Sequence, residues 1–472
     1  KRVILDCKRS RANELATSSH RLLLPRPFHA IDNVLAIQRS LQARRKRRRA
    51  QDLDLEMIIA DFVDAYWAIP LHAAERRFQV ARWRGKWIVF LRTGQGARES
   101  SLTWGMISAM VGRVGQSLYD ESELLLQVYT DDPWSVVAGT LQEREDAIAC
   151  ILSLWMTLGL GVAYHKAVRG QDVVWIGIRY TLRPSGVDVS VNPDILDEVK
   201  RSVDRMLVHN RVPVADLRRL AGQANHIAGM VIAWRPFLSC FWAALRRSSQ
   251  TARAELVWTR QILPSLLWLL AFLTHRAGTL KRCYRMHHHF NRGVAVTIAF
   301  DASTFGIGGI LMVGNVIMEF FLDRLTARDA ERFAHALGSS RGQQTWEALA
   351  LLVSLRLWRS WWSSSRFRVI VHSDSVTALY LLVNGTTRSE VNVTIAREIS
   401  LELGSGLYVP DEAVHIPGVT NVIPDALSRF EDEQTTPLPA CLARATQREV
   451  PARGPSWYLA AVPPRRERRT RG

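Results

Sequence analysis

The pattern of hydrophobic and polar positions divides the chain into parts of different character. Between residues 55 and 180, short apolar runs alternate with helical patterns, as they do in α/β and α+β domains. Residues 190–250 read as helices with basic faces, and residues 251–290 read as an apolar helical bridge. A second alternation of strands and helices occupies residues 294–430. We therefore predict a domain boundary near residues 285–293.

Local signals refine this division. The segment Asn192–Asp194, with its central proline, predicts a helix start. The basic run Arg44–Arg49 forms either a solvated loop or a patch that contacts phosphates. From residue 431 the chain is rich in Pro and Arg, a composition that predicts a disordered tail.

The charge balance favours a polyanionic partner. The 472 residues carry 62 basic and 44 acidic side chains, a net charge of +18, which favours nucleic acid or a membrane surface. The longest apolar run, Ile262–Leu273, contains Pro264 and is shorter than a bilayer requires. A chain of this length exceeds one compact core, so we expect two or three domains.

The cysteines and the start of the chain indicate the compartment. Five cysteines lie far apart, and none has the CxxC spacing of a zinc site. Free thiols fit a reducing compartment, and no signal peptide opens the chain. We therefore expect a soluble intracellular protein, cytoplasmic or nuclear, without a membrane partner. Because the chain begins at Lys1 rather than at Met, we expect a fragment of a longer protein.

Two acidic segments in the first half of the chain carry candidate chemistry. The apolar strand pattern of Met57–Ala60 leads into Asp61, and a second apolar run leads into Tyr129–Asp132, which another apolar run follows. This second pattern predicts a β-hairpin with adjacent aspartates at its tip. Paired carboxylates beside an apolar sheet are unfavourable unless a cation neutralises them. Two Mg²⁺ ions there would support phosphoryl transfer; ordinary turn chemistry is the alternative.

Both segments resemble motifs of one enzyme family. Asp61–Tyr66 resembles the first palm motif of reverse transcriptases, and Tyr129–Asp132 resembles their Tyr-x-Asp-Asp motif. The resemblance implies that Asp61 and Asp131 hold the catalytic metal ions, with Asp132 beside them.

The same resemblance implies a nucleotide-binding set. The backbone amides of Asp64 and Ala65 would bind the triphosphate, and Tyr66 would exclude a 2′-hydroxyl. The pair Gln95-Gly96 is similar to the family's Gln-Gly motif, which positions the incoming nucleotide and the template. On its own, this pair is an ordinary loop sequence.

Further matches concern single residues. Lys166 would lie near the triphosphate, where a cation can neutralise the leaving pyrophosphate; an exposed lysine is the alternative. Arg2 matches the fingers arginine over the incoming nucleotide, and Leu102 stands where the family often has Pro. The residues implied to contact nucleic acid are Tyr129, Trp175, Gly177, Arg218 and Arg219. A core position for the tryptophan and ordinary solvation of the two arginines are the alternatives.

Four acids in the second half follow an order of strand, helix, strand and helix. Asp301 ends an alternating strand, Glu347 opens an apolar helix, Asp374 ends another strand, and Asp425 lies in a last helical segment. Each acid alone fits a helix start or a strand end. Together, in this order, they resemble the ribonuclease H fold. The resemblance implies that they bind two Mg²⁺ ions and hydrolyse the RNA of an RNA–DNA hybrid.

Two departures and two histidine features accompany this second set. The segment Gly418–Asn421 lacks the histidine of cellular ribonucleases H, and Pro424 stands where alanine is usual. His415 falls on an expected strand and is interpreted as structural. The run His287–His289 has no acidic or cysteine neighbour in the sequence and is interpreted as a loop rather than a metal site.

The resemblance as a whole predicts a multidomain chain of α+β and α/β type from a retrotransposon polyprotein, of the long-terminal-repeat or DIRS type. Residues 1–185 would form partial fingers and palm, 186–290 a helical thumb and connection, 291–430 a ribonuclease H-like domain with a mixed five-stranded sheet, and 431–472 the tail.

The implied activity is RNA-directed DNA polymerisation with ribonuclease H cleavage. Its cofactor would be Mg²⁺, with Mn²⁺ as a substitute. Its partners would be an RNA template, a DNA primer, the RNA–DNA hybrid and deoxynucleoside triphosphates. The alternative is an inactive remnant, or a domesticated protein, that binds nucleic acid without catalysis.

Overall fold

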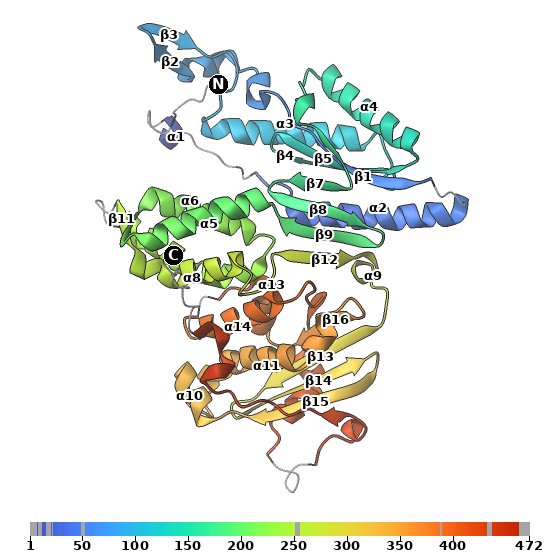
Figure 1. The fold of residues 1–472 in the computed structure, drawn as a ribbon, viewed down its shortest axis with the longest axis vertical. Helices are drawn as coiled ribbons and strands as arrows, with labels where there is room; N and C mark the ends of the chain where they lie inside the picture. Colours follow the sequence, from blue (N-terminus) through green and yellow to red (C-terminus); the bar gives the residue numbers. More distant parts are fainter. Residues whose placement is uncertain are drawn as a thin grey trace, which may run out of the picture. The chain divides into compact units, whose positions relative to one another are not determined.

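The computed structural model describes residues 7, 12–15, 20, 22–48, 52–250, 255–387, 389–431 and 437–461 (Figure 1). The chain forms two compact units, Lys1–Val189 and Ser190–Gly472. Both are of mixed α/β type, with helices and several sheets. In the described part of the chain, no helix is both long and apolar enough to cross a membrane.

The first unit is built on a four-stranded sheet with the order β4-β5-β1-β6. Its strands are β1 (Asp54–Ile59), β4 (Leu124–Tyr129), β5 (Asp132–Gly139) and β6 (Val168–Gly170). Strand β5 pairs antiparallel with both β4 and β1, and β1 pairs antiparallel with β6. Strands β1 and β5, which are separated by some seventy residues in the sequence, thus become neighbours.

Helices cover both faces of this sheet. Helix α2 (Pro27–Arg48) packs on one face, and α3 (Arg98–Gln116) and α4 (Leu141–Thr157) pack on the other (Figure 1). Successive side chains of a strand point to opposite sides. The side chains of β5 therefore pack under the helices on both faces of the sheet. On the α3–α4 side, Phe62 packs edge-on against Trp104 and Trp155, with ring centroids 5.8 and 5.1 Å apart.

Shorter elements complete the first unit. They are α1 (Ala12–Leu15), η1 (Ala65–Ala68), η2 (Ala73–Phe78), β2 (Val80–Trp83), β3 (Lys86–Val89), η3 (Tyr164–Lys166), β7 (Asp172–Trp175) and β8 (Ile178–Arg183). Strand β9 (Gly186–Val191) runs into the second unit.

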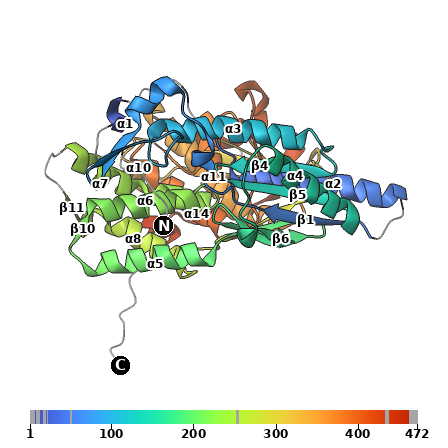
Figure 2. The same ribbon diagram turned by 90° about the horizontal axis from the view of Figure 1, so that it is seen from above.

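The second unit begins with helices. Helix α5 starts where the sequence predicts: the Asn192 side chain accepts a hydrogen bond from the Asp194 amide at 3.2 Å, and Pro193 occupies the first turn. Helix α5 packs against α6 and α8 (Figure 2). The elements up to residue 290 are α5 (Pro193–Val208), β10 (Arg211–Pro213), α6 (Val214–Ile227), η4 (Ile232–Phe237), α7 (Ser239–Gln250), β11 (Leu256–Trp258), α8 (Thr259–Leu273), β12 (Lys281–Arg285) and α9 (Met286–His289). The expected helical bridge therefore also contains strands.

A second sheet has the order β17-β16-β13-β14-β15-β18. Its strands are β13 (Ala295–Ala302), β14 (Gly306–Val313), β15 (Val316–Arg324), β16 (Arg368–Ser373), β17 (Glu412–His415) and β18 (Thr446–Gln447). Strand β13 pairs antiparallel with β14 and parallel with β16, so the sheet is mixed. The sequence predicted five strands; the sixth, β18, comes from the segment expected to be disordered.

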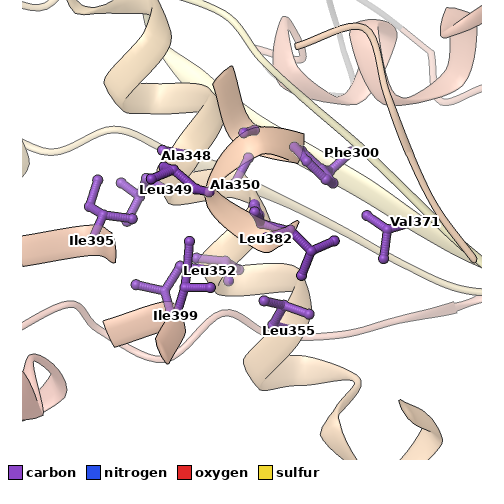
Figure 3. Close-up of a cluster of buried hydrophobic side chains, with 14 of the residues drawn as sticks. Phe300, Ala348, Leu349, Ala350, Leu352, Leu355, Val371, Leu382, Ile395 and Ile399 are labelled. Atoms are coloured by element: carbon purple, nitrogen blue, oxygen red, sulfur yellow. The ribbon is translucent and has the colours of Figure 1, made fainter. Parts of the chain in front are cut away.

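The core of this unit surrounds α11 (Gln343–Leu357), which packs between the sheet and the helices α13 (Val376–Asn384) and α14 (Val393–Gly404) (Figure 3). A helix enclosed on all sides is apolar all round, and Leu349, Leu352 and Leu355 of α11 are fully buried. The remaining helices are α10 (Ala327–Phe333), α12 (Arg359–Trp362) and α15 (Val422–Ser428).

The prediction of a disordered tail is wrong for residues 437–461, which pack on the second unit. Strand β18 pairs in parallel with β15, and Tyr458 is buried in the core. The Arg453 guanidinium donates to both oxygens of Asp329, at 3.0 and 2.8 Å, and pairs with Asp323. Composition suggested a solvated segment, but an arginine can be buried when carboxylates that are distant in the sequence neutralise it.

Candidate functional sites

The first carboxylate set consists of Asp61 and Asp131, which lie on adjacent segments of the first sheet. The β4–β5 hairpin is present as the sequence predicts, with Tyr129 opposite Asp132 and the turn at Thr130-Asp131. The amide of Phe62 donates to the carbonyl of Asp131 at 2.9 Å. This bond holds the residue after Asp61 against the hairpin tip.

The hairpin tip is held in an unusual backbone conformation. Thr130 has a φ of 55°, which is rare for a β-branched residue. The indole nitrogen of Trp104, which is fully buried in α3, donates to the Thr130 carbonyl at 2.7 Å. Thus a core side chain fixes the turn that presents Asp131.

A lysine from a third segment reaches Asp61. The amide of Ala163 donates to the Asp61 carbonyl at 2.8 Å, and the adjoining turn η3 brings the Lys166 ammonium into an ion pair with the Asp61 carboxylate. The sequence placed Lys166 near a triphosphate; here its partner is the carboxylate itself. The pair shows that Asp61 can bind a cation at this position.

The expected nucleotide-binding residues surround the same point. Asp64 has a left-handed conformation (φ 48°) and precedes η1, which contains Ala65 and Tyr66. Burial raises the pKa of Tyr66, and the negative charge of Asp131 raises it further. Tyr66 therefore lies within the electrostatic reach of the aspartate at the hairpin tip.

The loop with Gln95 and Gly96 is joined to this region. The Thr93 hydroxyl donates to the Tyr66 carbonyl, and the side chain of Asn13 donates to the Gly96 carbonyl at 3.0 Å. Leu102, where the family often has Pro, lies in the first turns of α3, so this departure leaves the helix intact.

Of the residues expected to contact nucleic acid, Trp175 is buried. Its indole nitrogen donates to the Asp132 carbonyl at 3.1 Å, and its ring stacks on Trp134 with centroids 5.6 Å apart. The edge of Tyr129 faces the Trp175 ring at 6.3 Å. Gly177 forms the β7–β8 turn with a φ of 77°. Trp175 thus supports the hairpin from within the core.

The remaining expected contacts fall elsewhere. Arg218 and Arg219 are exposed on α6 while Leu217 and Leu220 are buried, so this helix has a basic face, as the sequence predicts. Both arginines belong to the second unit, whereas the first carboxylate set belongs to the first unit. Arg2 lies outside the described residues.

The second carboxylate set gathers all four acids that the sequence singled out. Asp301 is the penultimate residue of β13 and is 6% exposed. Burial raises the pKa of Asp301 to about 7, and the charges of Asp374, Asp425 and Glu347 add to the rise. Burial also raises the pKa of Glu347, which lies in α11. Four carboxylates, one on a strand, one directly after a strand and two on helices, thus form one field of negative charge.

Polar neighbours that the sequence reading missed hold these acids in place. The Asn421 amide nitrogen donates to the Phe300 carbonyl at 3.0 Å and to Asp374 at 3.4 Å. The Ser428 hydroxyl donates to the Asp301 carboxylate at 3.3 Å. Asn421 precedes the first residue of α15, and Ser428 lies three residues after Asp425 on the same helix. This spacing around Asp425 was the available signal.

Glycine allows α15 to approach the sheet closely. A Cβ on Gly308 of β14 would lie 2.4 Å from the Leu427 side chain and 2.7 Å from the Ser428 amide. Pro424, the second departure from the family, is buried within α15. The helix that carries Asp425 therefore forms despite the proline.

The histidines have structural partners. His415 contacts the Asp374 carbonyl at 3.1 Å, in line with its interpretation as structural. His288 lies 3.3 Å from Asp411, and the run His287–His289 forms most of helix α9. The interpretation of this run as a loop is therefore wrong, and His288 has an acidic partner. The acidic partner comes from more than a hundred positions away, which the local sequence does not reveal.

The chemistry of both sets suits a hard divalent cation, because carboxylate oxygens are the donors that Mg²⁺ prefers. In the described part of the chain, no three His, Cys, Asp or Glu side chains already stand in the positions that hold a metal ion. Burial is the main cause of the raised pKa of Asp301, and repulsion from the other three carboxylates adds to it. A cation would relieve that repulsion.

No protein-family model and no curated protein matches the chain. Among solved structures it is similar to the foamy viral protease-reverse transcriptase dRH in complex with double-stranded DNA, at 14% identity and a TM-score of 0.42 over 88% of this chain and 62% of that one. The same viral protein in complex with an RNA/DNA hybrid gives 13% identity and a TM-score of 0.39, over 80% of this chain and 45% of that one.

The chain thus spans about 62% of the length of the first of these viral proteins.

Proposed function

We propose that the chain is an RNA-directed DNA polymerase with ribonuclease H activity, from a retrotransposon polyprotein. The observation that carries the proposal is that each unit gathers acidic side chains that lie far apart in the sequence. In the first unit the Phe62 amide binds the Asp131 carbonyl and so joins the segment of Asp61 to the hairpin tip. In the second, Asp301 is in the field of three other carboxylates.

The proposal assigns one activity to each set. Residues 1–185 would provide partial fingers and palm, residues 186–290 the thumb and connection, and residues 291–430 the ribonuclease H-like domain. The net charge of +18 suits polyanionic substrates: an RNA template, a DNA primer and their hybrid.

Mg²⁺, or Mn²⁺ in its place, would be held by Asp61, Asp131 and Asp132 in the first site. The second site would use Asp301, Glu347, Asp374 and Asp425. When bound, the ions neutralise charge that develops in phosphoryl transfer and in hydrolysis.

Within the first site the chain's own residues would bind and select the nucleotide. The backbone amides of Asp64 and Ala65 would donate to the triphosphate, and the ring of Tyr66 would exclude a 2′-hydroxyl. Lys166 would leave Asp61 when a metal ion binds and would then face the phosphates with its ammonium group. The loop at Gln95 and Gly96, fixed by Asn13, would position the base pair.

One observation favours a second candidate, a nucleic-acid-binding protein without catalytic activity. Lys166 already neutralises Asp61. If this ion pair persists in the presence of Mg²⁺, the first set cannot bind metal. Both candidates predict binding to hybrid that weakens with salt, so only activity distinguishes them.

The test is an assay of both activities on one substrate. The chain is incubated with a labelled RNA template, a DNA primer, deoxynucleoside triphosphates and Mg²⁺, and extension and cleavage are read on one gel. We expect Asp131→Asn to lose extension alone and Asp374→Asn to lose cleavage alone. Hybrid binding without either activity in the unmodified chain would establish the second candidate.

A further inference from the structure

The hairpin formed by β2 and β3 lies in solvent on both faces. All four residues of β3 are exposed, and in β2 only Ala81 is half-buried. Trp83 and Trp87 are 59% and 71% exposed, more than any other tryptophan of the described residues. A two-stranded hairpin without packing is marginally stable. Large exposed aromatic side chains therefore need a reason other than the core.

The register places one tryptophan and one cation on each face. Arg82 lies opposite Trp87, and Trp83 lies opposite Lys86. Because residues directly opposite share a face and successive residues alternate, the two tryptophans point to opposite sides. The Arg84 guanidinium carbon lies 4.4 Å from the centre of the Trp83 ring, and that of Arg82 lies 5.9 Å from the Trp87 ring.

The turn between the strands is well defined. Arg84 and Gly85 have φ values of 49° and 79°, so both central residues are left-handed. This is the turn that matches the twist of a two-residue hairpin. The tip that carries Arg84 is therefore a fixed structure and not a loose loop.

The charge of this hairpin is almost entirely positive. Between Glu75 and Arg92 there is a single acid and there are six cations: Arg76, Arg77, Arg82, Arg84, Lys86 and Arg92. Within the described residues, Arg82, Arg84 and Lys86 have no carboxylate partner. An unneutralised basic surface with interleaved aromatic rings complements a polyanion that carries flat rings.

Hydrogen bonds join the base of the hairpin to the first carboxylate site. The amide of Leu71 donates to the Leu91 carbonyl and that of Thr93 to the Ile69 carbonyl, both at 2.9 Å. The Thr93 hydroxyl in turn donates to the Tyr66 carbonyl. A continuous hydrogen-bonded ladder thus leads from Tyr66 to the base of the hairpin, which projects beyond α3 at the upper left of Figure 1.

We propose that this hairpin binds single-stranded nucleic acid, namely the unpaired template strand that approaches the first site. Trp83 and Trp87 stack on unpaired bases, while Arg82, Arg84 and Lys86 contact phosphates. Bases in a duplex already stack on each other, so single strands are preferred. The identity of the strand as template rests on the polymerase function proposed above, whereas single-strand binding does not.

Binding is tested on the full chain without catalysis. The dissociation constant (Kd) for a fluorescent oligo(dT) strand and for a blunt duplex is measured by anisotropy in EDTA. We expect the double variant Trp83→Ala/Trp87→Ala to weaken single-strand binding roughly 30-fold, from the usual value of base–aromatic stacking. Duplex binding should change little. The double variant Trp83→Phe/Trp87→Phe keeps an aromatic face and should restore most of the affinity.

A matched control removes an exposed, arginine-stacked tryptophan elsewhere. Trp258 is 43% exposed, and Arg211 lies 4.2 Å from its ring centre. Trp258→Ala should leave the single-strand Kd unchanged. The charge variant Arg82→Ala/Lys86→Ala should reduce the slope of log Kd against log salt by about 1.4, that is, two phosphate contacts, whereas the tryptophan variant should keep the slope.

Extension assays separate this inference from the proposed function. With a long template overhang, the Trp83→Ala/Trp87→Ala variant should extend more slowly than the unmodified chain; with a one-nucleotide overhang both should extend equally. If the unmodified chain does not extend primers but the variant still loses single-strand affinity, the proposed polymerase function is wrong. The proposed binding of single strands by the hairpin would then still hold. The inference would be overturned if the Trp83→Ala/Trp87→Ala variant had the same single-strand Kd as the unmodified chain. It would also be overturned if this variant lost binding to anionic lipid vesicles but kept its binding to single strands.

Discussion

Asp301 lies near the end of β13, and Asp374 directly follows the neighbouring parallel strand β16. Burial raises the pKa of Asp301, and the charge of Asp374 raises it further. Neither position is unusual by itself, since aspartate commonly follows a strand. The parallel pairing of β13 with β16 makes them a site. The pH dependence that arises from Asp301 can therefore be measured, with and without a divalent cation, to test whether this set binds a cation.

The first prediction concerns pH. Folded Asp301 has a pKa of about 7 against 3.8 for an ordinary aspartate, so it binds its proton more tightly in the folded chain. Its stabilising contribution is therefore complete below the unfolded pKa and is lost as pH rises through the folded pKa. Without divalent cations, we expect the free energy of unfolding to fall by up to about 4 kcal/mol over this window. Urea unfolding at several pH values measures it.

Asp301→Asn is the control for this prediction, because it removes the titrating group and should flatten the profile. Mg²⁺ should also flatten it, since a cation at the site opposes protonation. A profile of equal slope in the Asp301→Asn variant would show that other groups dominate the pH dependence.

The second prediction concerns Arg453, the buried cation of the C-terminal segment. Burial raises the pKa of Asp329, but Arg453 outweighs this effect and holds the pKa below its ordinary value. Arg453→Met would leave Asp329 buried without its cation, and we expect a loss of about 3–5 kcal/mol in the free energy of unfolding. Arg448→Met is the matched control. Arg448 belongs to the same segment, is 47% exposed and lies 3.5 Å from Glu319, so its loss should cost at most about 1 kcal/mol.

The third prediction concerns the Lys166–Asp61 ion pair. Because the ammonium and a metal ion compete for the same carboxylate, Lys166→Met should tighten Mn²⁺ binding at the first site, measured by electron paramagnetic resonance. The same variant should extend primers more slowly at saturating metal, since its cation no longer faces the phosphates. Lys200→Met, at an exposed position of α5, should change neither. Weaker Mn²⁺ binding in Lys166→Met would contradict the competition.

The sequence predicted best where the pattern is local. The two apolar runs on either side of Thr130-Asp131 predict the β4–β5 hairpin, and Asn192-Pro193 predicts the start of α5; both are present. Prediction from the sequence failed where a residue's partner is distant along the chain. Arg453 was expected to be solvated, because Asp323 and Asp329, which bind it, lie more than a hundred positions away. The support of Asp374 by Asn421 was missed for the same reason, since only the folding of α15 onto β13 and β14 brings them together.

The last prediction concerns Trp104, a positioning residue that acts through the backbone of Thr130. Its indole donates to the Thr130 carbonyl at 2.7 Å, and Thr130 carries the left-handed backbone that presents Asp131. Trp104→Phe keeps most of the buried ring but removes this donor. We expect about a tenfold lower kcat for extension, because small misplacements of a catalytic group are costly, with KM and RNA cleavage unchanged.

Trp134→Phe is the matched control for this change. Trp134 is also fully buried, but its indole nitrogen has no hydrogen-bond partner among the described residues. Both variants lose the same ring volume, so both should lose similar packing energy, and only Trp104→Phe should also lose a hydrogen bond, worth about 1 kcal/mol. A selective fall of kcat in Trp104→Phe would therefore locate the effect in the turn. An equal fall in both variants would attribute it to core packing, and the bond to Thr130 would then have no separate role in presenting Asp131.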